Sequence, residues 1–232
     1  MFDDDWAKPI KPEHHFTHWV WQTELDSKAK EYDEYIAYAD AEFGRLYKHL
    51  SDSGLLDDTM VIITSDHGEM FERGIWGHST ETLYDPVVRV PLLVSRPGQK
   101  QRVDIHTPTS SVDVLPTILH QTGHAIPSWC EGEILPGFGA NVSTANRRVF
   151  TLDAKGNSVN KAITRGTLSL VKDKYKLIRY FGYPGYDDQY ELYNMLEDPD
   201  ELENLYEALP SIAGDMLVEM NEKLGKVNSP YL

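Results

Sequence analysis

The sequence predicts an α/β fold followed by a small antiparallel sheet with a helix. In the first half, a long amphipathic segment is followed by a short loop and by the mostly apolar run TMVIITS at residues 59–65. This order of helix, loop and buried strand is typical of an α/β sheet with parallel strands. In the last third, short strand-like runs separated by turns indicate antiparallel pairing. We therefore expect two parts, residues 1–145 and residues 146–232.

The composition is that of a globular protein with one domain, or with one domain and a small appendage. Of the 232 residues, 41% are hydrophobic and 25% are charged, and the net charge is −15. Such an acidic chain lacks the basic face that a nucleic-acid groove needs, so we expect no nucleic-acid partner. The single cysteine, Cys130, excludes an internal disulfide bond. No run of about 18 apolar residues is present, so we expect no membrane span.

The first residues, MFDDDWAKPIKPEHH, carry acids and prolines where a signal peptide has a basic and then an apolar segment. The sequence therefore predicts no signal peptide in this chain, and the cellular location is unknown from it. The triplet NVS at Asn141 matches a glycosylation sequon, which is a weak signal by itself.

A long helix is predicted after an irregular segment at residues 1–23. The evidence is an apolar stripe with alternating steps of four and three residues: Leu25, Ala29, Tyr32, Ile36, Ala39, Phe43, Leu46 and Leu50. Gly54 is expected to end this helix in a left-handed conformation. Asp57 and Asp58 then turn the chain into the apolar run at residues 59–65, which is predicted to be a strand buried on both faces.

A second buried strand, VPLLVS at residues 90–95, ends at the triplet RPG. A helix is then expected within TPTSSVDVLPTILHQTG at residues 107–123. Ser110 or Ser111 can cap its start and Gly123 can end it, provided that Pro116 falls in the first turn. Glycine and proline punctuate the following residues, 125–146, as expected for a connecting loop.

The remaining residues contain four strand-like runs: RRVFTL at 147–152, KAITRGTLSLVKD at 161–173, KYKLIRYF at 174–181 and YELYNM at 190–195. The triplet KDK at residues 172–174 is typical of a tight hairpin. Asp198 is expected to cap a C-terminal helix, with Pro199 just inside its first turn.

Asp66 and His67 directly follow the first apolar strand, in the stretch VIITSDHGEMFERGIWGH at residues 61–78. Ligands bind at the carboxyl ends of strands in open α/β sheets, and a carboxylate with an imidazole can hold a divalent cation. Gly68 allows a sharp turn there, and the loop that follows can bring His78 back over the strand end. A histidine in that place can bind an anionic oxygen or protonate a leaving group. The structural alternative is that Asp66 caps a helix and His67 binds a buried carbonyl.

Several segments, taken in order along the chain, resemble the sulfatase family of the alkaline-phosphatase superfamily. They are YADAEFGRLYKHL, SDHGEMFERGIWGH, LYDPVVRVPLLVSRPG, SSVDVLPTILHQTG, KYKLIRY and YELYNMLEDPDELENL. Together they cover nearly the whole chain from about residue 24. The resemblance implies an alkaline-phosphatase-like sheet with flanking helices, present here in part, and a small C-terminal antiparallel sheet with a helix.

The same resemblance implies roles for single residues. Asp66 and His67 match the two family positions that ligate the catalytic divalent cation, with calcium as the first expectation and zinc, manganese or magnesium as alternatives. His78 falls where the family places a lysine or histidine that contacts a sulfate or phosphate oxygen. Arg89 and Pro91 match a packing feature of the following strand, and Asp40 and Asp113 match family positions that we interpret as structural.

One family feature is absent from the sequence. Sulfatases carry a formylglycine made from a Cys/Ser-x-Pro-x-Arg motif, which lies upstream of the segments seen here, and neither Cys130 nor Ser110 and Ser111 have that context. The acids Asp3–Asp5 likewise lack the apolar strand that would precede paired metal-binding acids. We therefore interpret the chain as the C-terminal portion of a sulfatase that is inactive alone. Self-association, or pairing with the missing N-terminal half, would cover its open sheet edge.

The resemblance implies a sulfuric ester hydrolase acting on a sulfate ester, with a sulfated carbohydrate as one candidate. Family members are often periplasmic, secreted or lysosomal. The first alternative is a phosphodiester or phosphonate ester hydrolase, or a phosphoglycerol-type transferase, of the same superfamily. The second is a non-catalytic binding module that packs sugar rings on tyrosines, although these tyrosines also suit strands: Tyr175, Tyr180, Tyr183, Tyr186, Tyr190 and Tyr193.

Overall fold

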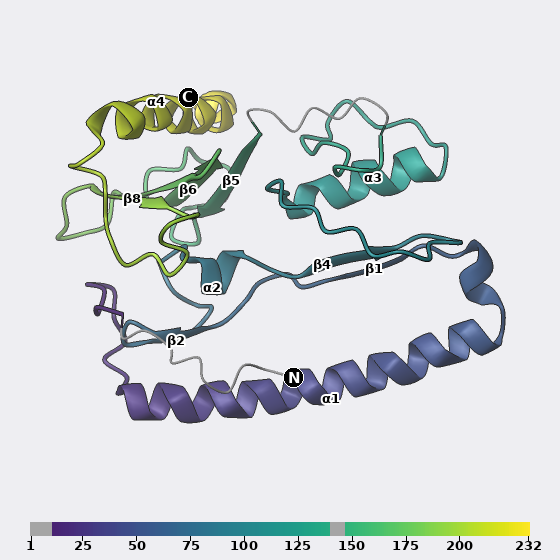
Figure 1. Cartoon of the computed structure of the whole chain (residues 1–232). Helices are drawn as coiled ribbons and strands as arrows, with labels where there is room; N and C mark the ends of the chain where they lie inside the picture. Colours follow the sequence, from purple (N-terminus) through teal and green to yellow (C-terminus); the bar gives the residue numbers. More distant parts are fainter. Residues whose placement is uncertain (1–10, 140–146) are drawn as a thin grey trace. The chain divides into compact units, whose positions relative to one another are not determined.

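A computed structural model describes residues 11–139 and 147–232 of the chain (Figure 1). The chain forms two compact units, which we call the N-terminal unit (residues 1–80 and 84–103) and the C-terminal unit (residues 81–83 and 104–232). The sequon at Asn141 and the acids Asp3–Asp5 lie outside the described residues. The boundary expected near residue 145 also falls there and stays a prediction. None of the described helices is both long and apolar enough to cross a membrane.

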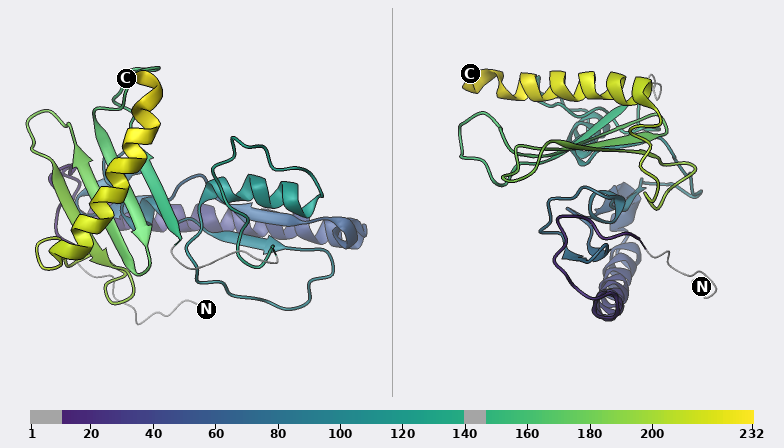
Figure 2. Two further views of the ribbon diagram at one scale, coloured as in Figure 1. Left: turned by 90° about the horizontal axis from the view of Figure 1, so that it is seen from above. Right: turned by 90° about the vertical axis from the view of Figure 1, so that its left-hand side faces the viewer.

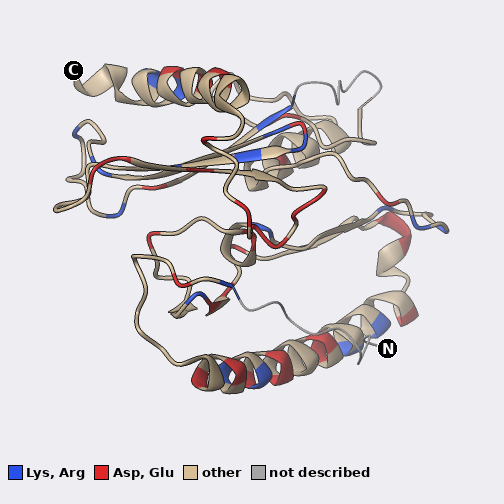
Figure 3. Cartoon of the chain, turned by 60° about the vertical axis from the view of Figure 1, so that its left-hand side comes forward, with Lys and Arg blue, Asp and Glu red and all other residues tan. Residues whose placement is uncertain are grey.

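The predicted long helix is α1, Gln22–Asp52, in the N-terminal unit. It ends as expected, because Gly54 follows in the left-handed conformation at φ 73°. A short 3₁₀ turn, η1 at Leu55–Asp58, then leads into the first strand. Both acidic and basic residues lie along α1 (Figure 3). The apolar stripe is only partly covered, since Leu25 is fully buried whereas the side chain of Leu46 is 53% exposed.

Strand β1, Val61–Thr64, pairs with β4, Leu92–Ser95, in a two-stranded sheet. The two strands run antiparallel, so the expectation of parallel pairing was wrong. A parallel partner needs a crossover that carries the chain back along the strand. Here the connection stays near the end of β1 and contains only short elements. Neither strand is fully buried, contrary to the prediction, and Leu93 is 57% exposed.

A hairpin occupies the connection, formed by β2, Met70–Glu72, and β3, Ile75–Gly77. Its two turn residues, Arg73 and Gly74, both have positive φ, at 57° and 72°. This is the two-residue turn whose twist matches that of paired strands. Helix α1 packs against β2, with the rings of Tyr32 and Phe71 5.4 Å apart. The single-turn helix α2, Asp85–Val88, completes the connection to β4.

In the C-terminal unit, the 3₁₀ turn η2, Ser111–Asp113, runs into helix α3, Val114–Gln121. Ser110 and Asp113 form a capping box, so Ser110 is the cap. Pro116 lies in the first turn of α3 and Gly123 follows the helix at φ 73°, as predicted. Asp113 is 2% exposed and pairs with Arg147, which confirms its structural role. Asp40, by contrast, is exposed on α1.

Four antiparallel strands in sequence order form the second sheet: β5 Arg148–Asp153, β6 Gly166–Lys172, β7 Tyr175–Phe181 and β8 Gln189–Asn194. Helix α4, Pro210–Asn228, lies across one face of this sheet (Figure 2). Buried aliphatic side chains of the sheet and helix, such as Leu170, Leu177 and Met216, form the core between them. The predicted C-terminal antiparallel sheet with a helix is therefore confirmed.

Two local predictions in this unit have different outcomes. The hairpin at residues 172–174 is confirmed, because Asp173 occupies the turn between β6 and β7 at φ 53°. The start of the C-terminal helix at Asp198 was wrong, since α4 begins at Pro210. The Asp198 carboxylate instead accepts the backbone N–H groups of Leu202 and Glu203 and closes a loop.

Glu219 on α4 links the helix to the sheet. Its carboxylate accepts hydrogen bonds from Arg148 of β5 and from the Lys172 ammonium of β6, the latter at 2.7 Å. The hydrogen bond from Arg148, helped by that from Lys172, lowers the pKa of Glu219 below its ordinary value of 4.5. A carboxylate whose pKa is lowered by folding stabilises the fold above the unfolded pKa, and this contribution is lost as the pH falls through the folded pKa.

We expect Glu219→Gln to lower the free energy of unfolding at neutral pH by about 1 kcal/mol, because the ion pairs are partly exposed. The difference from the unchanged chain should shrink as the pH falls below 4.5. Urea unfolding over a pH series measures both effects. Glu222→Gln, an exposed change on the same helix, is the control. A difference for Glu219→Gln that is the same at every pH would contradict the expectation.

Candidate metal centre

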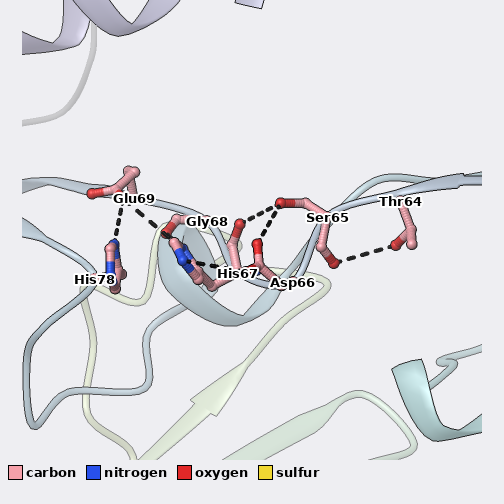
Figure 4. A network of polar contacts seen from close by, with 7 residues as sticks. All are labelled: Thr64, Ser65, Asp66, His67, Gly68, Glu69 and His78. Atoms are coloured by element: carbon pink, nitrogen blue, oxygen red, sulfur yellow. Dashed lines mark hydrogen bonds and ion pairs between the residues drawn. The ribbon is translucent and has the colours of Figure 1, made fainter.

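The chain turns immediately after β1, and side-chain hydrogen bonds hold this turn (Figure 4). The Ser65 hydroxyl donates to the His67 carbonyl oxygen at 2.7 Å, and the His67 backbone N–H donates to Asp66 Oδ1 at 3.0 Å. These bonds fix the backbone from which the Asp66 and His67 side chains project. No described helix begins at this position, so Asp66 is not a helix cap.

The imidazole of His67 has one nitrogen engaged and the other available. His67 Nδ1 lies 3.0 Å from the Gly68 carbonyl oxygen, which is the carbonyl contact expected from the structural alternative. A carbonyl only accepts, so Nδ1 carries the proton and Nε2 has a free lone pair. Histidines that ligate metals commonly donate their second nitrogen to a carbonyl in this way. The carbonyl contact is therefore compatible with metal binding through Nε2.

Asp66 offers its carboxylate beside that nitrogen. Asp66 Oδ2 lies 3.7 Å from His67 Nε2, and the Asp66 side chain is 87% exposed. Its own backbone N–H, together with the backbone N–H of His67, lowers the pKa of the Asp66 carboxyl below its ordinary value. An ionised carboxylate oxygen and an imidazole nitrogen at this separation can both ligate one cation, so the two residues fit a shared ion.

Gly68 is required for close packing at this turn. Its N–H donates to the Val87 carbonyl oxygen at 2.8 Å. A Cβ added at Gly68 would lie 2.1 Å from the Pro86 carbonyl oxygen, on helix α2. The sequence suggested that Gly68 was needed for a sharp turn, but its φ is not in the left-handed region. The residue instead lets the backbone pass directly against α2.

The β2–β3 hairpin brings His78 back to the strand end, as the sequence suggested for this segment. Met70 pairs with Gly77 in the hairpin, so Glu69 and His78 are the next residues outward on the two strands. The ring centroids of His67 and His78 are 3.7 Å apart. His78 Nδ1 lies 2.5 Å from Glu69 Oε1, and the His78 side chain is 44% exposed.

Glu69 is the site residue that the sequence reasoning missed. Ligand atoms of His67, Glu69 and His78 all lie within 4.8 Å of one another, whereas Asp66 is not part of this group. The Glu69 side chain is only 17% exposed and contacts both imidazoles. Treating residues 72–78 as a plain loop hid this pairing. Recognising Arg73-Gly74 as a two-residue hairpin turn would have placed Glu69 opposite His78.

A pocket of about 480 Å³ adjoins this group within the N-terminal unit. Its lining includes His67 and Glu69 together with Tyr32 and Ile36 of α1. Arg89 and Pro91 line it as well, and the Arg89 side chain is 77% exposed rather than packed. The strand end therefore meets an open space large enough for a small organic ligand.

Two family models match the chain: that described as sulfatase, over residues 2–124, and that described as N-sulphoglucosamine sulphohydrolase, C-terminal, over residues 74–229. The first covers more than half of the chain and includes the strand end and the hairpin. The chain belongs to the sulfatase family. The family resemblance that we inferred from the order of these segments along the sequence is thereby confirmed.

This sulfatase chain is similar to several curated proteins. It is 33% identical to mouse (Mus musculus) arylsulfatase K over 186 residues, which cover 76% of this chain and 32% of the relative. It is 30% identical to choline-sulfatase from Rhizobium meliloti, covering 74% of this chain and 32% of the relative. The chain thus spans about a third of the length of these curated relatives.

Solved structures share the fold of this chain. A phosphonate monoester hydrolase from Silicibacter pomeroyi aligns with a TM-score of 0.65 and 25% identity, over 82% of this sulfatase chain and 39% of that chain. A structure of BT4656 in complex with its substrate D-glucosamine-2-N,6-O-disulfate aligns with a TM-score of 0.59 at 22% identity. This alignment covers 84% of this chain and 39% of that chain. The alkaline-phosphatase-like fold class expected from the sequence is thereby confirmed.

Proposed function

We propose that this chain supplies part of the active site of a sulfuric ester hydrolase. The observation that carries the proposal is that Asp66 lies beside His67, and His67 beside His78, at the end of β1 in a chain of the sulfatase family. Asp66 and His67 would hold a divalent cation through Oδ2 and Nε2. A cation bound there would act as a Lewis acid and stabilise negative charge on the transferring group.

His78 would contact the substrate through Nε2. Its Nδ1 is 2.5 Å from Glu69 Oε1, and an ionised carboxylate only accepts, so Nδ1 carries the proton. In the doubly protonated ring, the Nε2–H is then the group that would donate to an oxygen of the sulfate group or of the leaving alcohol. Holding the ring by its other nitrogen orients this contact before the substrate arrives, which is how fixed polar groups lower a barrier.

The ion that we expect first is calcium, on the resemblance to the family. An imidazole nitrogen, however, suits zinc or manganese better than calcium, which prefers oxygen ligands. The two donors Asp66 and His67 are also fewer than the six or more ligands that calcium takes. We therefore propose that further ligands come from outside the described residues.

The proposed substrate is a sulfate ester, and a sulfated carbohydrate is the first candidate. Among the relatives, choline-sulfatase is named for a sulfate ester, and BT4656 was solved with a disulfated glucosamine as its substrate. The sequence of this chain contains no Cys/Ser-x-Pro-x-Arg motif for a formylglycine. We expect the nucleophile to come from a different polypeptide segment, and this chain alone to give no turnover.

A partner surface is consistent with this proposal. In the described residues the β1–β4 sheet has two strands, with Leu93 largely exposed, and Ile36 on α1 is 51% exposed. Strand edges with apolar faces tend to pair with further chain. We propose that a nucleophile-bearing segment, or a second copy of this chain, covers them.

The test combines this chain with the nucleophile-bearing segment that we propose, and measures the activity of the pair. We expect Asp66→Asn and His67→Ala each to lower kcat/KM for 4-nitrophenyl sulfate by roughly 10²-fold or more, and His78→Ala to lower it by roughly 10²-fold. His106→Ala, at an exposed histidine outside the site, is the matched control. Wild-type activity in Asp66→Asn and His67→Ala would refute the proposed metal centre.

A second candidate is phosphonate or phosphodiester hydrolysis. The alignment with a phosphonate monoester hydrolase at a TM-score of 0.65 favours it. The same protein assayed with a phenyl phosphonate ester and with the sulfate of the same phenol separates the two. A larger kcat/KM for the phosphonate would identify this second candidate. A non-catalytic tyrosine-lined module is disfavoured, since Tyr180 and Tyr193 are 2% and 3% exposed in the sheet.

A further inference from the structure

A second pocket, of about 680 Å³, lies in the C-terminal unit, between the loop that joins β5 to β6 and the chain that follows β7. Two of its lining residues, Lys161 and Arg165, are cations, and none of its lining residues is an acid. This is unexpected in a chain with 37 acidic and 22 basic residues. We call this space the basic pocket.

The walls of the basic pocket are fixed by hydrogen bonds within the unit. The Asn157 amide donates to the carbonyl oxygens of Ala154 and Arg165, and its Oδ1 accepts the backbone N–H of Thr164 at 2.9 Å. Asn228 of α4 binds both backbone groups of Ile163, at 2.7 and 3.0 Å. Asn157 therefore connects the two ends of the loop, and Asn228 connects the loop to α4.

The guanidinium of Arg165 is held in one place on this wall. It donates to the Gly156 carbonyl oxygen at 3.1 Å. A Cβ added at Gly156 would lie 1.7 Å from the guanidinium, so the side chain lies directly over the glycine backbone. A guanidinium has five N–H donors, and this hydrogen bond uses one of them. The remaining donors suit the paired oxygens of a sulfate, phosphate or carboxylate. Lys161, the second cation of the lining, is exposed, and the described residues give its ammonium no ion pair.

The rest of the lining suits an uncharged polyol. Ser158, Asn160 and Thr164 add polar side chains, and Tyr231, which is 49% exposed, adds an aromatic face. The volume exceeds that of a single anion and lies in the range of small-ligand pockets. Polar groups with one aromatic face can bind both sides of a sugar ring.

We propose that the basic pocket binds a sugar that carries a tetrahedral oxyanion, such as a sulfate or phosphate ester. Arg165 would take two oxygens of the anion, and Lys161 would add a second positive charge. The sugar ring would lie against Tyr231. This inference rests on the C-terminal unit alone and does not depend on the metal centre or on hydrolysis.

The test titrates the full chain with glucose 6-sulfate, glucose 6-phosphate, glucose and inorganic sulfate, followed by ¹H–¹⁵N correlation spectra in the presence of a metal chelator. We expect glucose 6-sulfate or glucose 6-phosphate to bind with a dissociation constant on the order of 1 mM and to shift the amide signals of residues 156–165. Glucose should not bind. The two esters separate the sulfate source from the phosphate source.

Arg165→Met should weaken ester binding about tenfold, and Lys161→Gln roughly threefold. Lys155→Gln removes the same charge from the same loop at a residue that does not line the basic pocket, and it should change the affinity less than twofold. Arg165→Lys keeps the charge and should retain part of the affinity, which separates binding from loop folding. Far-UV circular dichroism reports whether each variant is folded.

Three outcomes would overturn the proposal. One is equal affinity in Arg165→Met and in the unchanged chain, and another is an equal loss in Lys155→Gln. The third is binding of inorganic sulfate as tight as that of the sugar esters, which would leave an ion site without a sugar. Repeating the titration in His78→Ala keeps the test separate from the proposed function, because binding at the basic pocket should persist in that variant.

Discussion

Replacing Glu201 with glutamine is expected to lower the free energy of unfolding of the C-terminal unit by about 3–5 kcal/mol. Glu201 Oε1 lies 2.8 Å from the Lys176 ammonium, and both side chains are 0% exposed. The substitution keeps the shape of the side chain but removes its charge. The Lys176 ammonium would then lose the buried counter-charge of Glu201, which is far costlier than losing a surface ion pair.

The position of this ion pair explains why it matters for the sheet. Lys176 lies on β7 next to Leu177, which packs into the core beneath α4, so the two side chains point to opposite faces of the sheet. Glu201 has a positive φ of 56° and lies in a loop that the Asp198 carboxylate closes. Its side chain meets Lys176 on the face of the sheet from which Lys176 projects. The ion pair therefore holds this loop against the face of the sheet opposite α4.

Two further variants make the expectation testable. Glu203→Gln removes a charge from an exposed residue of the same loop, and it should change stability by less than about 0.5 kcal/mol. The double variant Lys176→Met with Glu201→Leu removes both charges, and it should recover most of the loss. Urea unfolding followed by circular dichroism measures all three. A loss below about 1 kcal/mol for Glu201→Gln would show that the ammonium finds water or another partner.

The same loop shows where sequence reasoning reached its limit. Asp198 followed by Pro199 has the local pattern of a helix start, and that pattern predicted the wrong element. The buried pairing of Glu201 with Lys176 joins two residues far apart in the sequence, and no local pattern reveals it. Hairpins and caps set by neighbouring residues, such as Asp173 and Ser110, were predictable because their causes are local.

The N-terminal unit shows a related limit. Apolar content predicted that Val61–Thr64 and Leu92–Ser95 are strands, but it carried no information on their direction. The direction follows from the connection, in which a hairpin and one helical turn stay at the end of β1. The β2–β3 hairpin also places Glu69 opposite His78. The sequence indicated that His78 returns to the strand end, but the hairpin was not recognised, and Glu69 was therefore missed.

The second large effect is expected at Gly68. Gly68→Ala should lower the free energy of unfolding by about 1–3 kcal/mol, because the added Cβ would lie 2.1 Å from the Pro86 carbonyl oxygen. The obstacle is backbone on both sides, so no side chain can rotate away. Relief requires α2 to move from the turn, and this movement breaks the hydrogen bond from the Gly68 N–H to the Val87 carbonyl oxygen.

Gly44→Ala is the matched control. Gly44 lies inside α1, and a Cβ there would meet nothing within 4 Å. Alanine at an exposed helix position is favoured over glycine by roughly 0.8–1 kcal/mol, so this variant should be more stable than the unchanged chain. The two substitutions add the same methyl group, and their effects should have opposite signs in the same thermal and urea unfolding experiments.

Gly68→Ala should also report on the metal centre, because Gly68 lies between His67 and Glu69 in the chain. A backbone shift there moves both side chains and disturbs the contact between His67 Nδ1 and the Gly68 carbonyl oxygen. We expect the affinity for calcium, manganese or zinc, measured by calorimetry, to fall on the order of tenfold, the effect typical of disturbing the groups that orient a ligand. Gly44→Ala should bind the same ion as the unchanged chain does. If Gly68→Ala lost stability but kept its cation affinity, the strand end would be a packing feature only, and the ion would have to bind elsewhere.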